Sequence, residues 1–223
     1  MDQHYERLQF LKNKGFNPKV IYDIGAHQGL WSYQMQPIFS DSQFYLFEAN
    51  KENKPHLSKR GFPYFIDLLG NKDKAVVFYT SKNGDSTGAS IFCEKTSYYR
   101  GSNVKKQKLQ MKSLRSLVKK HKLQLPDLIK LDVQGAESLI IDGSPEVITH
   151  AEVVVMETKL LEYNSGAPLI HEMISLMTKL GYRMLDILEY HHLASGELNE
   201  IDVLFVKKDS KLIKKGLLKM KRR

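Results

Sequence analysis

The sequence Val-Ile-Tyr-Asp-Ile-Gly-Ala-His-Gln-Gly, residues 20–29, decides the fold that we expect for this chain. A short apolar run leads into Asp23, glycines follow at positions 25 and 29, and residues 30–39 form an amphipathic stretch. This order is typical of a buried parallel strand, a tight turn and a helix, which together open an α/β domain. Gly25 and Gly29 let the backbone turn without a Cβ, so a ligand can lie against bare peptide where N–H groups attract an anion.

The turn differs from the dinucleotide-binding fingerprint. His27 stands where the middle glycine would be, and no Gly-Lys-Ser/Thr follows. A pyrophosphate is therefore disfavoured, and a ligand with a carboxylate and a ribose fits better. The second expected strand, residues 43–47, ends on Glu48, about 20 residues past the glycines, where a carboxylate can accept both ribose hydroxyls. The alternative is an ordinary strand–helix turn with a solvated glutamate.

Composition limits the class of protein. A length of 223 residues suits one α/β domain, and the single cysteine, Cys93, excludes a disulfide framework and a cysteine-rich zinc site. No apolar run approaches the length of a membrane span, so we expect a cytoplasmic protein. The net charge of +9 is concentrated in residues 105–122 and 207–223. Such basic blocks bind nucleic acid or anionic lipid, or simply form a solvated face.

The first helix precedes the glycine turn. Tyr5, Leu8 and Leu11 lie on one stripe of a short helix at residues 5–14, so residues 1–17 are expected to form a helical extension. Beyond the second strand, the periodicity of apolar residues predicts further elements. The expected strands lie at residues 64–68, 76–81, 104–111, 128–132, 151–156, 183–189 and 201–207, and the expected helices at residues 51–60, 113–121 and 168–180.

Some of these segments carry a further interpretation. Asn50 and Ser113 are good N-caps for the helices that follow them. The lysines of residues 104–111 are typical of an edge strand, where they block unwanted pairing. The polar loop at residues 82–90 is either a surface loop or a cover for a substrate. A loop between the last two strands holds His191 and His192.

Residues 128–137, Leu-Ile-Lys-Leu-Asp-Val-Gln-Gly-Ala-Glu, form the second informative stretch. Lys130 interrupts an apolar strand, and burying an unpaired ammonium is costly. We therefore expect it to pair with a carboxylate, for which Asp132, Glu137 and Glu157 are candidates. A salt bridge that only orders the edge of the core is the alternative. Because Asp132 and Glu157 end neighbouring strands, their carboxylates should open on the same crevice.

These motifs resemble the FkbM family of S-adenosylmethionine-dependent methyltransferases, in the class I Rossmann-like group. The Ile-Lys-x-Asp-x-x-Gly-Ala-Glu stretch is the most specific part, whereas all class I methyltransferases share the glycine turn. Ala49 stands where the family often has proline, and Gln134 where it often has glutamate, so no carboxylate role is expected at position 134. The likeness spans residues 18–208 and rests on residues 20–29, 47–50, 129–137 and 200–206.

The resemblance implies a seven-stranded, mostly parallel sheet with the last strand antiparallel and helices on both faces. It implies one methyltransferase domain over residues 1–208 and a basic helix or tail over residues 209–223. S-adenosylmethionine would place its methionine end over residues 25–29, its ribose on Glu48 and its adenine by Asp67 and Leu68. The cofactor-binding residues implied in this way are Asp23, Gly25, His27, Gly29, Glu48, Ala49, Asp67, Leu68, Asp132 and Val133.

Family members mostly methylate hydroxyl groups of sugars, glycolipids or natural products, which leads us to expect an O-methyltransferase acting on a glycan. A sugar hydroxyl must lose its proton during attack, which calls for a general base or for a divalent cation such as magnesium or manganese. Asp132 is the first candidate as base or metal ligand, with Lys130 holding its carboxylate. Glu157, His191 and His192 are further catalytic candidates.

Three alternatives remain open from the sequence. An RNA methyltransferase would use the basic blocks on phosphates, but no basic surface interleaved with aromatic residues is evident, so nucleic acid is not the expected partner. A natural-product acceptor and a non-catalytic binding module are the others. The basic segment at residues 207–223 is expected to favour contact with an anionic membrane.

Overall fold

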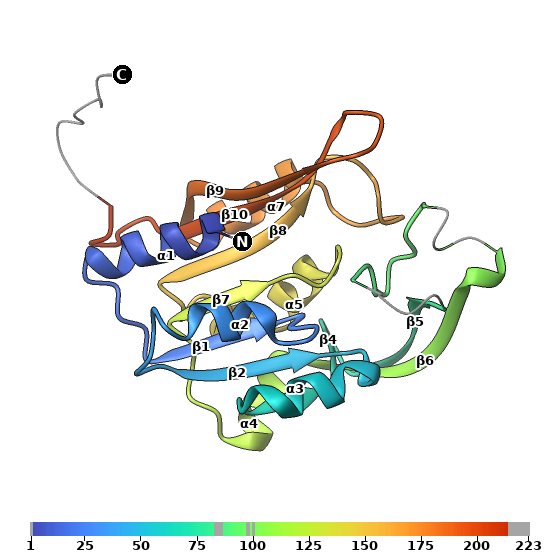
Figure 1. The fold of residues 1–223 in the computed structure, drawn as a ribbon, viewed down its shortest axis with the longest axis horizontal. Helices are drawn as coiled ribbons and strands as arrows, with labels where there is room; N and C mark the ends of the chain where they lie inside the picture. Colours follow the sequence, from blue (N-terminus) through green and yellow to red (C-terminus); the bar gives the residue numbers. More distant parts are fainter. Residues whose placement is uncertain (1, 83–86, 97–98, 100, 214–223) are drawn as a thin grey trace.

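A seven-stranded sheet forms the centre of the protein, seen here in a computed structural model that describes residues 2–82, 87–96, 99 and 101–213 (Figure 1). Neighbouring strands pair in parallel except β10, which runs antiparallel to both β8 and β9. The expected sheet with an antiparallel last strand is thus confirmed. Across the sheet the strands are β3 (Tyr64–Ile66), β2 (Gln43–Glu48), β1 (Val20–Ile24), β7 (Leu128–Leu131), β8 (Val153–Lys159), β10 (Leu198–Lys207) and β9 (Tyr182–His192).

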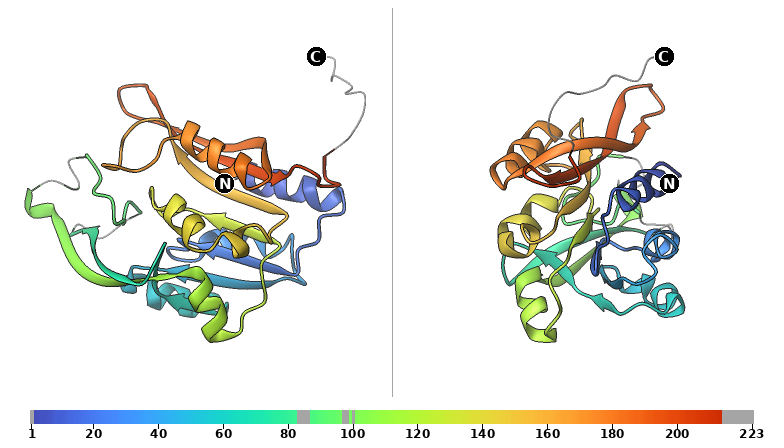
Figure 2. Two further views of the ribbon diagram at one scale, coloured as in Figure 1. Left: turned by 180° about the vertical axis from the view of Figure 1, so that it is seen from behind. Right: turned by 90° about the vertical axis from the view of Figure 1, so that its left-hand side faces the viewer.

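Helices cover both faces of this sheet (Figure 2). Alternate residues of β1 show why: Tyr22 and Ile24 pack with the helices of one face, whereas Ile21 packs with those of the other. The face that Ile21 joins carries α1 (Asp2–Asn13), α2 (Leu30–Met35) and α3 (Lys54–Arg60), which follows the short 3-10 helix η1 (Lys51–Asn53). The opposite face carries α4 (Leu114–His121), α5 (Glu137–Gly143), α6 (Pro145–Ile148) and α7 (Ile170–Lys179).

A separate three-stranded sheet lies beyond the carboxyl ends of the central strands (Figure 1). It consists of β4 (Leu68–Gly70), β6 (Val104–Ser113) and β5 (Lys74–Ser81), in that order. Two predictions are corrected here. The strand expected at residues 64–68 is split at Asp67 between the two sheets, and β6 is a central strand rather than an edge. Lys106 and Lys108 point outward from β6, so they do not prevent pairing on either side of it.

Both ends of the described chain pack against the domain. Leu8 and Leu11 of α1 are fully buried, so the predicted extension is part of the core. Beyond the expected boundary at residue 208, Leu212 is buried in the same cluster, and Ser210 hydrogen-bonds Glu152. The greater part of the predicted basic tail, residues 214–223, lies outside the described residues. None of the helices that the structure describes is long and apolar enough to cross a membrane.

Local capping explains several helix starts. The side chain of Asn50 accepts a hydrogen bond from the Glu52 N–H, and that of Ser113 accepts one from the Ser116 N–H. Both caps are confirmed, because a short oxygen-bearing side chain satisfies a backbone donor that the first helical turn leaves free. Gly101–Asn103 forms a further 3-10 turn, η3, which leads into β6.

Candidate active site

A cavity of about 590 Å³ opens at the carboxyl ends of β1 and β7, where the order of the strands reverses. Ligands of open α/β sheets bind at this kind of position. Most residues predicted for the site line the cavity, whereas Asp23 and Gly29 are not among its described lining residues. The predicted residues at its wall are Gly25, His27, Glu48, Ala49, Asp67, Leu68, Lys130, Asp132, Val133, Glu157, His191 and His192.

The glycine turn forms one wall. Gly25 has a φ of +79°, and a Cβ there would lie 1.7 Å from the carbonyl oxygen of Asp132, so only glycine fits between β1 and β7. The N–H groups of Gly25 and Ala26 both donate to the carbonyl of Phe47, and that of His27 donates to Glu48. The expectation that the N–H groups of this turn face an anion is therefore corrected for these three residues, since the protein itself satisfies them.

Glu48, at the end of β2, braces this turn from inside the cavity. Its Oε2 accepts the His27 N–H at 2.7 Å and its Oε1 accepts the Asn50 N–H at 2.6 Å. Burial raises the pKa of its carboxyl, an effect that the N–H donors of Asn50 and His27 oppose. The side chain of Asn53 also donates to this carboxylate. A carboxylate has about four acceptor positions, so Glu48 can hold the turn and still accept a ribose hydroxyl.

Asp67 and Leu68 lie between the two sheets, at the end of the cavity predicted for adenine. Asp67 is fixed by a salt bridge to Lys112 of β6. Ala49 and Phe78 add apolar surface, and Ala49 packs with the small cluster that contains Leu68 and Phe78. An apolar slot beside a fixed carboxylate fits a flat base that carries an amino group.

Asp23 has a different place from the one expected. It is fully buried, and its Oδ2 accepts a hydrogen bond from Ser32 Oγ of α2 at 2.6 Å. Burial raises the pKa of its carboxyl, opposed by the charge of Lys130, which is its register partner on β7. Asp23 therefore ties β1 to α2 beneath the cavity and lies beside the charge of Lys130, and its contact with the cofactor stays a prediction.

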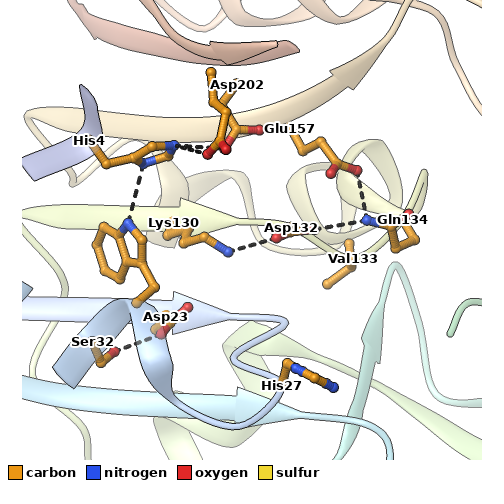
Figure 3. Close-up of polar contacts among 12 residues, drawn as sticks. His4, Asp23, His27, Ser32, Lys130, Asp132, Val133, Gln134, Glu157 and Asp202 are labelled. Atoms are coloured by element: carbon orange, nitrogen blue, oxygen red, sulfur yellow. Dashed lines mark hydrogen bonds and ion pairs between the residues drawn. The ribbon is translucent and has the colours of Figure 1, made fainter. Parts of the chain in front are cut away.

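Lys130 and Asp132 begin a chain of polar contacts across the cavity floor (Figure 3). Lys130 Nζ lies 2.8 Å from Asp132 Oδ2, so the first of its candidate partners is the observed one. Gln134 Nε2 then donates to Asp132 Oδ1 at 3.1 Å and to Glu157 Oε1 at 2.9 Å. Lys159 Nζ lies 2.7 Å from Glu157 Oε1. One amide thus joins the two predicted carboxylates.

The two carboxylates differ in proton affinity. Burial would raise the pKa of Asp132, but the charge and hydrogen bond of Lys130 outweigh it and hold that pKa below its usual range. The pKa of Glu157 is raised well above its usual range by burial and by the charge of Asp132, against the opposing charge of Lys159. At neutral pH the arrangement favours an ionised Asp132 beside a Glu157 that retains a proton more easily.

The turn after β7 is held by Glu137, the second candidate partner of Lys130. Its Oε1 accepts the N–H groups of Val133 and Gly135 at 2.8 and 3.3 Å. Burial raises its pKa to about 7, opposed by the donor from Val133. Gln134 has a φ of +56°, a costly conformation for a residue other than glycine. Glu137 therefore stabilises the turn that points Gln134 at the two carboxylates.

His191 and His192 belong to the end of β9, not to a loop as predicted. The pairing of β9 with β10 extends the hairpin farther than the apolar pattern indicated. Both histidines are exposed at the rim of the cavity; His191 Nε2 lies 3.6 Å from Glu189, and His192 packs edge-to-face on Tyr190. From this position the two histidines stay candidates for contact with an acceptor, and they do not belong to the polar contacts of the cavity floor.

Sequence reasoning missed His4, which α1 places at the cavity wall with only 1% of its surface exposed. Tyr5, predicted on the apolar stripe, is 40% exposed. The spacing of His4 from Leu8 and Leu11 matches one helix face, and this was the available signal. His4 Nε2 lies 2.9 Å from Asp202 Oδ2 of β10. Figure 3 marks this contact with a dashed line.

The ligand-type atoms of His4, Glu189 and Asp202 lie within 4.8 Å of one another, close enough to be tested as a metal site. The indole N–H of Trp31 donates to His4 Nδ1 at 3.3 Å. A histidine that binds a metal through one nitrogen normally donates the N–H of the other, and here that second nitrogen is an acceptor. This donor set does not fit a cation, and it does not include Asp132 or Glu157.

Comparisons with known proteins identify the family. The family model described as "Methyltransferase FkbM domain" matches residues 23–184, more than half of the chain. No curated protein matches the sequence. Among solved structures, N-methyltransferase NodS from Bradyrhizobium japonicum WM9 is 8% identical with a TM-score of 0.51, over 92% of this chain and 95% of that one. This likeness supports the fold alone.

Two other solved structures match with lower TM-scores. Magnesium protoporphyrin IX methyltransferase (ChlM) from Synechocystis PCC 6803, with bound SAM, is 8% identical with a TM-score of 0.48, over 92% of this chain and 80% of that one. Precorrin-6y C5,15-methyltransferase from Geobacter metallireducens GS-15 is 12% identical with a TM-score of 0.49, over 92% and 88% of the two chains.

Proposed function

Since the chain belongs to the FkbM methyltransferase family, whose members use S-adenosylmethionine, we propose that it methylates a hydroxyl group of a sugar, glycan or glycolipid. The observation that carries this proposal is the pair of carboxylates, Asp132 and Glu157, that Gln134 joins at the cavity floor. Carboxylates accept hydrogen bonds from hydroxyls, and one of them can take the proton that a hydroxyl loses when it is methylated.

The residues present fit the cofactor. Gly25 lines the cavity with no side chain, Glu48 can accept a hydrogen bond from a ribose, and Asp67 lies beside an apolar slot for adenine. S-adenosylmethionine supplies an activated methyl group on a sulfonium. The protein's own contribution is to hold the acceptor in line, which is the main requirement of methyl transfer.

Asp132 is the proposed proton acceptor. Lys130 and Gln134 fix both of its oxygens in place, and its side chain is 30% exposed, compared with 9% for Glu157. The acceptor oxygen loses electron density as its new bond to carbon forms, so its proton becomes acidic enough for a carboxylate of lowered pKa. Glu157, which accepts from Gln134 and is paired with Lys159, holds the other end of the amide that orients Asp132.

The charge of the cavity favours a neutral acceptor. Glu157, Glu189, Glu200 and Asp202 gather on its β8–β10–β9 side, with the ammonium of Lys159 against Glu157 and Glu200. A phosphate group placed there would meet like charge, so an RNA acceptor is the weaker candidate. A divalent cation held by Asp132 is the alternative to direct proton transfer.

The test is transfer of a labelled methyl group from S-adenosylmethionine to a panel of neutral glycosides, amines and short RNAs. In Asp132→Asn, turnover should fall by roughly 10²–10⁴, because the amide keeps the shape but loses the basic oxygen. The dissociation constant of S-adenosylmethionine, measured by calorimetry, should change by less than about threefold. Asp142→Asn, at an exposed position of α5, is the matched control.

Three results would contradict parts of the proposal. Near-normal turnover by Asp132→Asn would remove Asp132 as the proton acceptor. Methylation of an amine but of no hydroxyl would refute the acceptor class. If chelation abolishes activity and added magnesium or manganese restores it, a divalent cation held by Asp132 replaces direct proton transfer to Asp132. If a chelator has no effect, direct proton transfer to Asp132 is supported.

A further inference from the structure

The N-terminal helix contributes to the active-site cavity through a buried contact chain. His4 of α1 lies between Trp31 of α2 and Asp202 of β10 and lines the same cavity as Asp132. This series of contacts thus joins α1, α2 and β10. Figure 3 shows the His4 ring pointing from α1 toward Asp202, on the side of the floor opposite Asp23.

The donors and acceptors of this chain fix the histidine in one tautomer. An indole N–H can only donate, so His4 Nδ1, 3.3 Å from Trp31 Nε1, must be the acceptor. The proton of the neutral ring is then on Nε2. That N–H faces Asp202 Oδ2 at 2.9 Å, with Glu189 Oε2 at 3.6 Å. Trp31 therefore makes His4 a hydrogen-bond donor to the carboxylates of β9 and β10.

These carboxylates form a row that needs such a donor. Asp202 is the direct register partner of Glu157 on β8 and of Glu189 on β9, so the three side chains share one face of the sheet. Like charges directly opposite each other on neighbouring strands are destabilising. Lys159 compensates at the Glu157 end, and His4 donates at the other end. A costly row of this kind, placed at a ligand cavity, indicates a role in binding.

We propose that His4, held in its Nε2–H tautomer by Trp31, is a positioning residue that orients Asp202 to bind a hydroxyl group of the acceptor. His4 uses Oδ2 of Asp202, and Oδ1 accepts from the acceptor. The N-terminal helix is thus part of the acceptor subsite. This inference rests on the proposed hydroxyl acceptor for its role in binding, but the tautomer and its consequence for Asp202 do not depend on it.

The first test measures the tautomer directly in the full-length protein. In long-range ¹H–¹⁵N correlation spectra, the histidine signal that His4→Gln removes should show a protonated Nε2 and an unprotonated Nδ1. Trp31 is the single tryptophan of the chain, so its indole N–H gives one resonance. That resonance should shift in His4→Phe and stay in place in His56→Gln, a change at an exposed position of α3.

The second test separates positioning from folding. His4→Phe keeps a ring but loses the donor, whereas His4→Gln retains an amide that can accept from Trp31 and donate to Asp202. We expect His4→Phe and Asp202→Asn to raise the KM of the glycoside identified as acceptor by at least about tenfold, the usual effect of losing a hydrogen bond to a charged group. The affinity for S-adenosylmethionine should be unchanged, and His4→Gln should recover most of the loss.

The outcomes are distinct. A proton on Nδ1, or on both nitrogens, would overturn the tautomer and with it the proposal. An unchanged acceptor KM in both Asp202→Asn and His4→Phe would also overturn it. If the panel contains no methylated hydroxyl acceptor, the proposed function fails, and the tautomer and indole measurements still decide whether His4 holds Asp202. If His4→Phe does not fold, Asp202→Asn and the wild-type spectrum carry the test.

Discussion

Replacing Lys130 by methionine tests whether its ammonium compensates the charges of Asp132 and Asp23 at the cavity floor. Lys130 is 7% exposed, its Nζ lies 2.8 Å from Asp132 Oδ2, and it faces its register partner Asp23, which is fully buried. Methionine has a similar length and fills the same space, so the change removes the charge and little of the packing. Two carboxylates would then lack their ammonium.

The expected loss of stability is large. Removing one partner of a buried ion pair costs about 3–5 kcal/mol, because the remaining charge stays out of water without compensation. At about 2–4 °C per kcal/mol for a chain of this size, the melting temperature should fall by about 6–20 °C. Asp132→Asn should restore part of this loss in the double variant, because it removes one of the two uncompensated charges.

The pH dependence has a definite sign. Burial already raises the pKa of Asp23 against the opposing charge of Lys130, whereas Lys130 holds the pKa of Asp132 below its usual range. Without that charge the folded-state pKa of Asp23 should rise further, and that of Asp132 should rise from its lowered value. A carboxyl whose folded pKa exceeds its unfolded pKa destabilises the fold increasingly as pH rises between the two values. The deficit of Lys130→Met relative to wild type should therefore shrink as pH falls from about 8 to about 5.

Urea unfolding at several pH values, followed by far-UV circular dichroism, measures this deficit. Lys120→Met, at an exposed position of α4, is the matched control and should lie within about 0.5 kcal/mol of wild type. A deficit of Lys130→Met below about 1 kcal/mol at neutral pH, or one that grows toward low pH, would refute the assignment of Lys130 as the compensating charge.

Two further predictions concern the cofactor end of the cavity. Glu48→Ala should weaken S-adenosylmethionine binding at least about tenfold by calorimetry, since charge-assisted hydrogen bonds contribute about 1.5–3 kcal/mol each, and it should also lower stability because the His27 and Asn50 N–H groups lose their acceptor; unchanged affinity would mean that Glu48 does not face the ribose. Gly25→Ala should abolish cofactor binding or folding, because its Cβ would lie 1.7 Å from the Asp132 carbonyl oxygen, and a variant with normal affinity in the same calorimetric assay would contradict this geometry.

The sequence by itself determined the parts of the protein that depend only on residues close together along the chain. The turn at Gly25, the caps at Asn50 and Ser113, and the strand around Lys130 all follow from local backbone chemistry and apolar periodicity. Parallel strands present their carboxyl ends at one edge of the sheet, so these local features also placed Glu48, Asp132 and Glu157 around one cavity.

Only the tertiary structure decided which strands and helices meet. The lysines of β6 indicated an edge, but the pairing partners of a strand are set by distant segments, and β4 and β5 both pair with it. The position of Asp23 in the motif does not reveal that it is fully buried and hydrogen-bonded to Ser32 of α2. His4 was missed, because its spacing from Leu8 and Leu11 indicates a shared helix face but not the strand that this face meets.

The contact of His4 with Asp202 joins residues almost 200 positions apart, through the packing of α1 on the sheet and the register of β10 beside β8 and β9. Register and packing are properties of the whole fold, since a shift of one residue would turn Asp202 to the opposite face. The position of His4 and Asp202 at the cavity wall therefore depended on the assembled fold, whereas the position of Gly25, Glu48 and Asp132 at that wall could be predicted from short motifs.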